Sequence, residues 1–106
     1  LNDVQHVEAA RFLAERALKE GGPGDDTSLD FVARRLLARS LRPEELEVVR
    51  ESLNDHLRHY HAHVDDARAL IAVGESRADA ALDPAVLAAW TMTANELFNL
   101  DEVLNK

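Results

Sequence analysis

The sequence predicts an all-α domain, a compact bundle of about five helices whose neighbours are mostly antiparallel. The 106-residue chain is rich in alanine and leucine and sparse in β-branched residues, a composition that favours helices. Apolar residues recur at spacings of three and four, and no segment alternates as a half-buried strand would. The short connections between the apolar runs predict antiparallel neighbours.

The first predicted helix runs from about Val4 to Glu20. Asn2 or Asp3 provides an N-cap, because a short polar side chain can accept hydrogen bonds from the free N–H groups of the first turn. The run Gly-Gly-Pro-Gly at 21–24 ends the helix, since glycine and proline interrupt helical periodicity.

The next two helices are predicted from caps and apolar spacing. Thr27 or Ser28 caps a helix that continues to about Arg39. Pro43 fits the first turn of a third helix, although the preceding Arg42 is a poor cap. This third helix has the cleanest apolar stripe in the chain: Leu46, Val49, Leu53, Leu57, Tyr60 and Val64.

In the second half of the chain, the sequence predicts a bend, a loop and a final helix. The third helix bends or restarts at 63–66, and a short helical segment then leads to Gly74. Residues 75–82 are expected to be a loop. The Asp83-Pro84 pair is a strong start signal for the last helix, in which Trp90 is expected to anchor the core.

Composition and charge limit the partners of the domain. The 20 acidic and 12 basic residues give a net charge of -8, which repels phosphate backbones. The densest basic run contains four arginines but no aromatic residue beyond Phe31, so we expect no nucleic acid; it is Arg34, Arg35, Arg39 and Arg42. No apolar run reaches the roughly 18 to 20 residues of a membrane span, so direct membrane insertion is not expected.

Histidines form the most distinctive candidate for chemistry. His56, His59 and His63 project within about 60° of one another on a helix, and Asp55 or Asp66 could add a carboxylate for a divalent metal. Three side chains spread over two turns reach one ion poorly, so we assign no metal site and keep the three histidines as weak candidates. Weak zinc binding and pH sensing near neutrality stay open for this cluster.

No motif for catalysis is present. Adjacent carboxylates such as Asp25-Asp26 and Asp65-Asp66 face different ways on a helix, so they do not converge as an acid and a base. With no cysteine in the chain, thiolate nucleophiles and Cys-x-x-Cys-His haem attachment are excluded within it. We therefore assign no catalytic or cofactor-binding residue.

Two sets of residues are candidates for interaction with a partner. Phe12 and Phe31 are predicted to point away from the apolar faces of two consecutive helices, where they would form one exposed patch. Asn95, Asn99 and Glu102 lie in one arc of the last helix, either as a solvent face or as a polar seam against other domains. Asn99 and Glu102 also have capping-box spacing, so the helix is expected to break and restart there.

Several runs along the chain resemble one protein family. They are Leu1–Arg11, Arg39, Pro43–Leu46, Ala72–Glu75, Leu87–Thr91 and Asn99–Glu102. In this order they are similar to the C-terminal part of a domain of unknown function found in planctomycete proteins that also carry a cytochrome-c-like domain. Phe12 and His6 depart from the family pattern, which has a small residue and an aromatic residue there.

This resemblance implies a place for the chain within a larger protein. Residues 1–106 would be a single helical domain, the C-terminal fragment of a multidomain bacterial protein that is exported and thus extracytoplasmic. The implied role is a non-catalytic scaffold or interaction module whose partners are the other domains of the parent, with any haem in one of those domains. A metal-binding or catalytic subdomain that uses the histidine cluster is the alternative, and homo-oligomer formation through the aromatic patch stays open.

Overall fold

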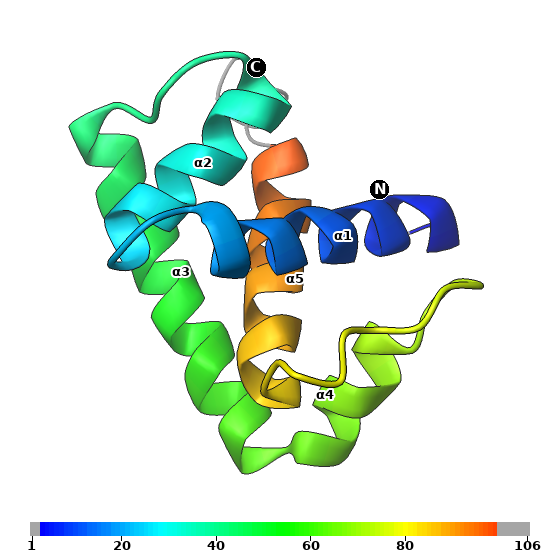
Figure 1. The fold of residues 1–106 in the computed structure, drawn as a ribbon. Helices are drawn as coiled ribbons and strands as arrows, with labels where there is room; N and C mark the ends of the chain where they lie inside the picture. The colour runs from blue at the N-terminus through cyan, green and yellow to red at the C-terminus, as the bar shows by residue number, and fades with distance from the viewer. Residues whose placement is uncertain (1–2, 100–106) are drawn as a thin grey trace.

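The chain folds into a bundle of five helices with no strand in the part that the structure describes (Figure 1). This computed structural model describes residues 3–99. The helices are α1 Val4–Glu20, α2 Asp25–Leu37, α3 Pro43–Ala62, α4 Val64–Ile71 and α5 Pro84–Phe98. The prediction of an all-α fold is confirmed.

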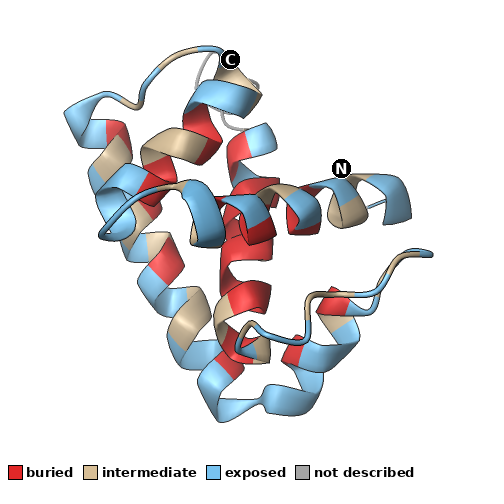
Figure 2. Ribbon diagram, viewed as in Figure 1, coloured by how far each residue is buried: buried red, intermediate tan, exposed pale blue. Residues whose placement is uncertain are grey.

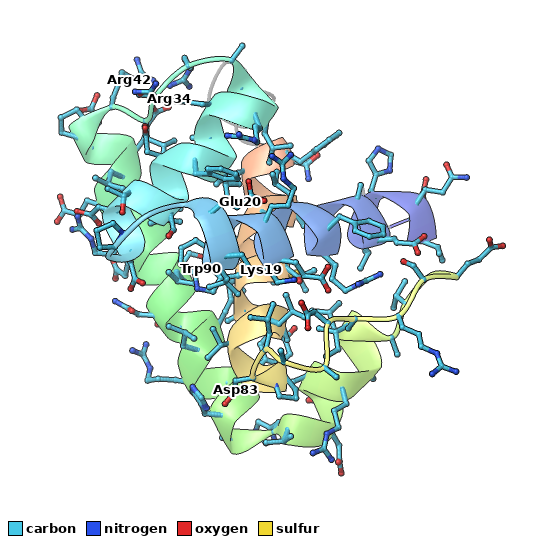
Figure 3. All side chains as sticks on the ribbon, viewed as in Figure 1. Lys19, Glu20, Arg34, Arg42, Asp83 and Trp90 are labelled. Atoms are coloured by element: carbon cyan, nitrogen blue, oxygen red, sulfur yellow. The ribbon has the colours of Figure 1, made fainter. Side chains whose placement is uncertain are left out.

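Helix α5 forms the centre of the bundle and contacts all four other helices. Ten of its 15 residues are buried, so it is enclosed on most sides rather than along one stripe (Figure 2). Alanines provide much of this surface, and small side chains allow neighbouring helices to approach closely. Trp90 is buried among the surrounding helices, as predicted for a core anchor (Figure 3).

Two helix starts have the predicted caps. The Asp3 carboxylate accepts hydrogen bonds from the backbone N–H groups of Gln5 and His6, at 2.6 and 3.4 Å. The Asp83 carboxylate accepts from the N–H of Ala85 at 2.8 Å, the second residue of a helix whose first residue is proline. Both caps satisfy donors that have no partner within the helix.

Helix α2 begins earlier than the prediction that placed its cap at Thr27 or Ser28. It starts at Asp25, and Gly24 occupies the cap with a positive φ of 85°, a conformation that glycine adopts without strain. The Thr27 hydroxyl donates instead to the Gly24 carbonyl at 3.0 Å. At the other end Ala38, with a left-handed φ of 58°, ends the helix before Arg39.

Helix α3 begins at Pro43, as predicted, although Arg42 has no acceptor for the first-turn N–H groups. Glu45 supplies half of a capping box: its carboxylate accepts from the Arg42 N–H at 2.8 Å. The same carboxylate, 3% exposed, binds the Arg39 guanidinium through two hydrogen bonds of 2.7 and 2.9 Å. The helix start is therefore fixed by a partly buried ion pair rather than by a side-chain cap.

The predicted break after α3 is confirmed. His63 ends α3 and precedes α4 with a non-helical backbone, and α4 then runs to Ile71. Gly74 has a φ of 100° and lies three residues after Ile71, the last residue of α4, so it is not the helix cap itself. Between residues 3 and 99, every helix is too short or too polar to cross a bilayer.

Truncating the centre of α5 should destabilise the whole bundle. Leu87 is fully buried, so Leu87→Ala should lower the free energy of unfolding by about 2–5 kcal/mol, because it removes apolar contacts and leaves a cavity. Urea unfolding followed by circular dichroism measures the change. The matched truncation Val4→Ala, at an exposed position, should change it by less than about 0.5 kcal/mol, and equal losses would contradict the central place of α5.

Glu45 should make the fold acid-sensitive. The Arg39 guanidinium, with help from Arg42, holds the pKa of Glu45 well below its ordinary value of 4.5. A lowered pKa stabilises the fold fully above pH 4.5, and that contribution is lost as the pH falls from 4.5 toward the folded-state pKa. Glu45→Gln should cost about 1–3 kcal/mol at pH 7, and the difference from wild type should shrink below pH 4.5.

The neighbouring exposed residue provides the control for this prediction. Glu44→Gln should change stability by less than about 0.5 kcal/mol at every pH, because the Glu44 side chain is mostly solvated. Urea unfolding between pH 3 and 7 measures both variants. A Glu45→Gln difference that is constant across this range would show that its ionisation does not stabilise the fold.

Candidate functional site

A small recess between α3 and α5 is the candidate site. Its volume is about 60 Å³. The lining combines aliphatic and polar side chains from two helices that lie side by side: Val48, Val49, Ser52, Thr93, Glu96 and Leu97. Val48 is 63% exposed, whereas Val49 and Leu97 belong to the core. The recess is thus a solvent-accessible hollow with an apolar floor and polar groups beside it.

A serine, a histidine and a glutamate meet at this recess. The Ser52 hydroxyl lies 2.9 and 3.1 Å from the two carboxylate oxygens of Glu96. His56 Nε2 contacts Glu96 Oε1 and lies 3.4 Å from the Ser52 hydroxyl oxygen. Helix α3 places Ser52 and His56 one turn apart, and α5 brings Glu96 to both of them.

The Glu96 carboxyl is a stable anion. Burial raises its pKa, but hydrogen bonds from His56 and Ser52 outweigh burial, so the pKa of Glu96 lies below its ordinary value of 4.5. The side chain is 47% exposed and therefore accessible from solvent. The recess consequently carries a negative charge at neutral pH.

The arrangement of these three residues differs from that of a catalytic triad. In a triad the histidine uses one ring nitrogen for the nucleophile and the other for the carboxylate. Here Ser52 and Glu96 both lie at Nε2 of His56, and the serine hydroxyl donates to the carboxylate. The histidine is therefore not placed to activate the serine, and the geometry favours binding over nucleophilic catalysis.

The structure separates His56 from the other two candidate histidines. His56 pairs with Glu96, while His59 Nε2 lies 3.3 Å from the Asp66 carboxylate at the start of α4. The rings of His59 and His63 lie 4.8 Å apart. Within residues 3–99, no three histidine or carboxylate side chains come close enough to share a metal ion.

The two phenylalanine candidates have different surroundings. Phe12 is about half exposed, and the Arg11 guanidinium lies 4.8 Å from its ring centroid. Phe31 is only partly exposed: it packs against the core, so the prediction that it points away is wrong. The guanidinium of Arg35 lies 3.5 Å from its ring centroid, and that of Arg16 on α1 lies 5.6 Å away. Arginines from two helices thus cover Phe31.

Asn95, in the predicted polar arc of the last helix, does not lie on a solvent face. Asn95 is only 6% exposed, because α5 is surrounded by other helices. Asn99 caps the end of α5, and its side-chain amide donates to the Asn95 carbonyl at 2.9 Å. The helix therefore ends where a break was predicted. Glu102 and the predicted restart lie outside the described residues.

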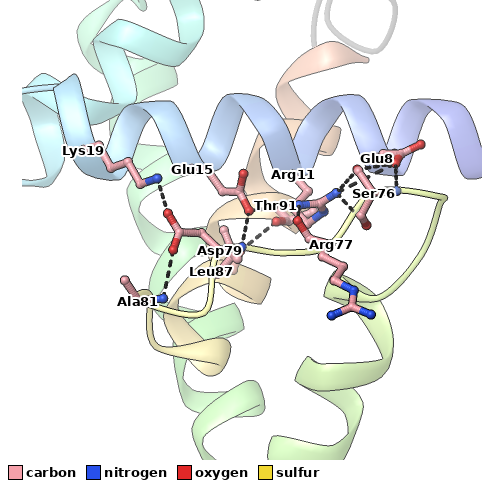
Figure 4. A network of polar contacts seen from close by, with 10 residues as sticks. All are labelled: Glu8, Arg11, Glu15, Lys19, Ser76, Arg77, Asp79, Ala81, Leu87 and Thr91. Carbon is pink, nitrogen blue, oxygen red and sulfur yellow. Dashed lines mark hydrogen bonds and ion pairs between the residues drawn. The ribbon is translucent and has the colours of Figure 1, made fainter.

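A second polar cluster joins α1 to the loop at 73–82 (Figure 4). Arg11 lies at its centre and is 1% exposed. Its guanidinium donates to Glu15 at 2.9 Å and to the backbone carbonyls of Arg77 and Ser76 at 3.1 and 3.2 Å. A buried guanidinium is tolerated when most of its donors are satisfied, and here both Nη groups form hydrogen bonds, whereas Nε has no partner among residues 3–99.

Carboxylates of α1 bind the N–H groups of the same loop. Glu8 accepts from the Ser76 N–H at 2.8 Å, and Glu15 accepts from the Asp79 N–H at 2.8 Å. Lys19 pairs with the Asp79 carboxylate. The loop is therefore attached to α1 along its length, and this cluster stabilises the fold instead of forming a site for chemistry.

The sequence carried a signal for this cluster. Glu8, Arg11, Glu15 and Lys19 fall within about 80° on a helix, so they form one polar stripe on α1. Such a stripe ordinarily indicates a solvated face. Its loop partners are more than 60 residues away along the chain, which local spacing does not reveal.

Comparison with known proteins finds no match: no family model, no curated relative and no solved structure is similar to the chain.

Removing the buried guanidinium should release the loop. Arg11→Met should destabilise the domain by about 3–5 kcal/mol, because Glu15 and two backbone carbonyls lose their buried donor. Hydrogen exchange at the Ser76 and Asp79 amides should also accelerate. Arg16→Met is the matched control, since Arg16 forms an exposed pair with Glu20 on the same helix and should cost about 1 kcal/mol at most.

Proposed function

We propose that this domain is a non-catalytic helical scaffold or interaction module of a larger protein. The recess between α3 and α5 carries the proposal, because it combines an exposed valine, an apolar floor and an ionised carboxylate without an activated nucleophile. A hollow of this kind suits recognition of a partner's side chain. It does not suit bond cleavage, which requires a base or a nucleophile poised near neutral pH.

The other polar clusters support the same proposal. Arg11 and the carboxylates beside it bond to the chain's own loop, and Glu45 fixes the start of α3. These groups are engaged in folding and are not directed at a substrate. Within residues 3–99, no three histidine or carboxylate side chains gather as a metal centre needs, so the histidine cluster adds no support to the alternative of a metal-binding subdomain.

The family resemblance supplies the proposed context. We infer that the parent is an exported planctomycete-type protein with a cytochrome-c-like domain, and that the partners of this module are the other domains of that protein. A parent sequence with an export signal and a Cys-x-x-Cys-His motif elsewhere would support this context. A gene that encodes neither would contradict it.

Titration with the rest of the parent protein tests the proposed role. The remaining domains, expressed separately, should cause saturable shifts in the amide spectrum of the ¹⁵N-labelled domain, because an interaction module buries part of its surface in the complex. Metal analysis of protein purified without a histidine tag is the second measurement, and substoichiometric zinc, copper and iron are expected. An unchanged spectrum, or one bound metal per chain, would overturn the proposal.

A further inference from the structure

We propose that the recess between α3 and α5 receives the side chain of a lysine from a basic segment of a partner protein. The methylene stem of the lysine would lie on Val48, Val49 and Leu97, and its ammonium group would bind the Glu96 carboxylate. This inference rests on the proposed role as an interaction module, and it names the partner chemistry that the recess fits.

The apolar part of the recess fits an unbranched aliphatic stem. Its volume is only about 60 Å³, so a side chain would lie along its apolar lining and would not be enclosed by it. Val48 extends the apolar surface to solvent, and Val49 and Leu97 form its base. A lysine stem buries its methylene groups on such a surface while its charged end stays solvated.

The polar part of the recess fits the ammonium group. A carboxylate offers about four acceptor positions, and Ser52 and His56 are the donors that Glu96 has among residues 3–99. With 47% of the side chain exposed, the carboxylate can accept a further hydrogen bond from outside. Leu97 at the base of the recess and Glu96 both line it, so one side chain can contact both.

The charges around the recess favour a basic partner. Helix α5 has no lysine or arginine. The two arginines of α3 are already engaged, Arg50 by Asp26 and Arg58 by Asp55. Glu51 on the same helix is exposed and forms no ion pair with residues 3–99. Among residues 3–99, neither α3 nor α5 therefore has an unengaged lysine or arginine to neutralise Glu96, and the net charge of -8 opposes both nucleic acid and a second copy of the chain.

The hydrogen bonds that Glu96 already accepts from Ser52 and His56 favour lysine over arginine as the bound residue. A guanidinium binds a carboxylate best through two parallel hydrogen bonds, one to each oxygen. Ser52 lies within 3.1 Å of both oxygens of Glu96, and His56 contacts one of them. These contacts hinder a pair of parallel hydrogen bonds from a guanidinium. An ammonium group is a compact donor that needs only one free acceptor position.

Three capped alanine-based helical peptides test the inference. The first carries lysines along one face, the second carries the same lysines acetylated, and the third carries arginines at these positions. Acetylation keeps the stem and removes the charge. We expect the lysine peptide to bind with saturable amide shifts at Val48, Ser52 and Thr93, at least about tenfold more tightly than either of the other two.

Variants of the domain locate the contact. Val48→Lys places a cation in the recess and should weaken binding by at least about tenfold, whereas Val4→Lys, at an equally exposed valine of α1, should not. Glu96→Gln should weaken binding of the lysine peptide by a similar factor, and Glu20→Gln on α1 is the control for this variant. Circular dichroism confirms that each variant is folded, and Val48→Lys alters an exposed residue, so it tests the contact even if Glu96→Gln is unstable.

The outcomes separate this inference from the proposed role. Equal affinity for lysine and acetyl-lysine peptides, shifts that map to another face, or no saturation up to about 1 mM would overturn the lysine site. Binding of the remaining parent domains would then still support an interaction module. Loss of both kinds of binding would overturn the module as well.

Discussion

Burial of α5 on most of its sides is the constraint on which the rest of this structure depends. An apolar helix of this kind must be covered by several neighbours, and α1, α2, α3 and α4 all contact it. Its alanines let these helices approach closely, so a shift of α5 would disturb four packing surfaces at once. The residues that α5 contributes to the recess are consequently held in place by the core.

The long loop before α5 is held in place by hydrogen bonds to α1. Residues 73–82 have no regular secondary structure, so their backbone groups need partners from elsewhere. Helix α1 supplies them through Arg11, Glu8 and Glu15. A buried arginine is costly to desolvate, but its hydrogen bonds to carbonyls and to Glu15 offset that cost, and the loop then covers the polar stripe of α1.

Local signals were enough to predict most of the fold. Caps such as Asp3 and Asp83, with apolar spacing between them, predict helix ends because the hydrogen bonds involved are local. Contacts between distant residues were not predictable in this way. Ser52 and Glu96 are 44 residues apart, and Asn95 is buried because α5 is covered on several sides, which no helical period indicates. The recess could therefore not be predicted from the sequence, because it is formed by residues that only the fold brings together.

The electrostatics of Glu96 support the proposed binding role of this recess. A general base works best when its pKa lies near the working pH, and a carboxyl usually reaches that range by burial away from donors. Glu96 has the opposite environment, because Ser52 and His56 stabilise its ionised form. A carboxylate with a lowered pKa abstracts protons poorly but keeps its charge over the whole neutral range. Such a group suits the recognition of a cation, and the apolar floor beside it suits a cation that is carried on an aliphatic stem.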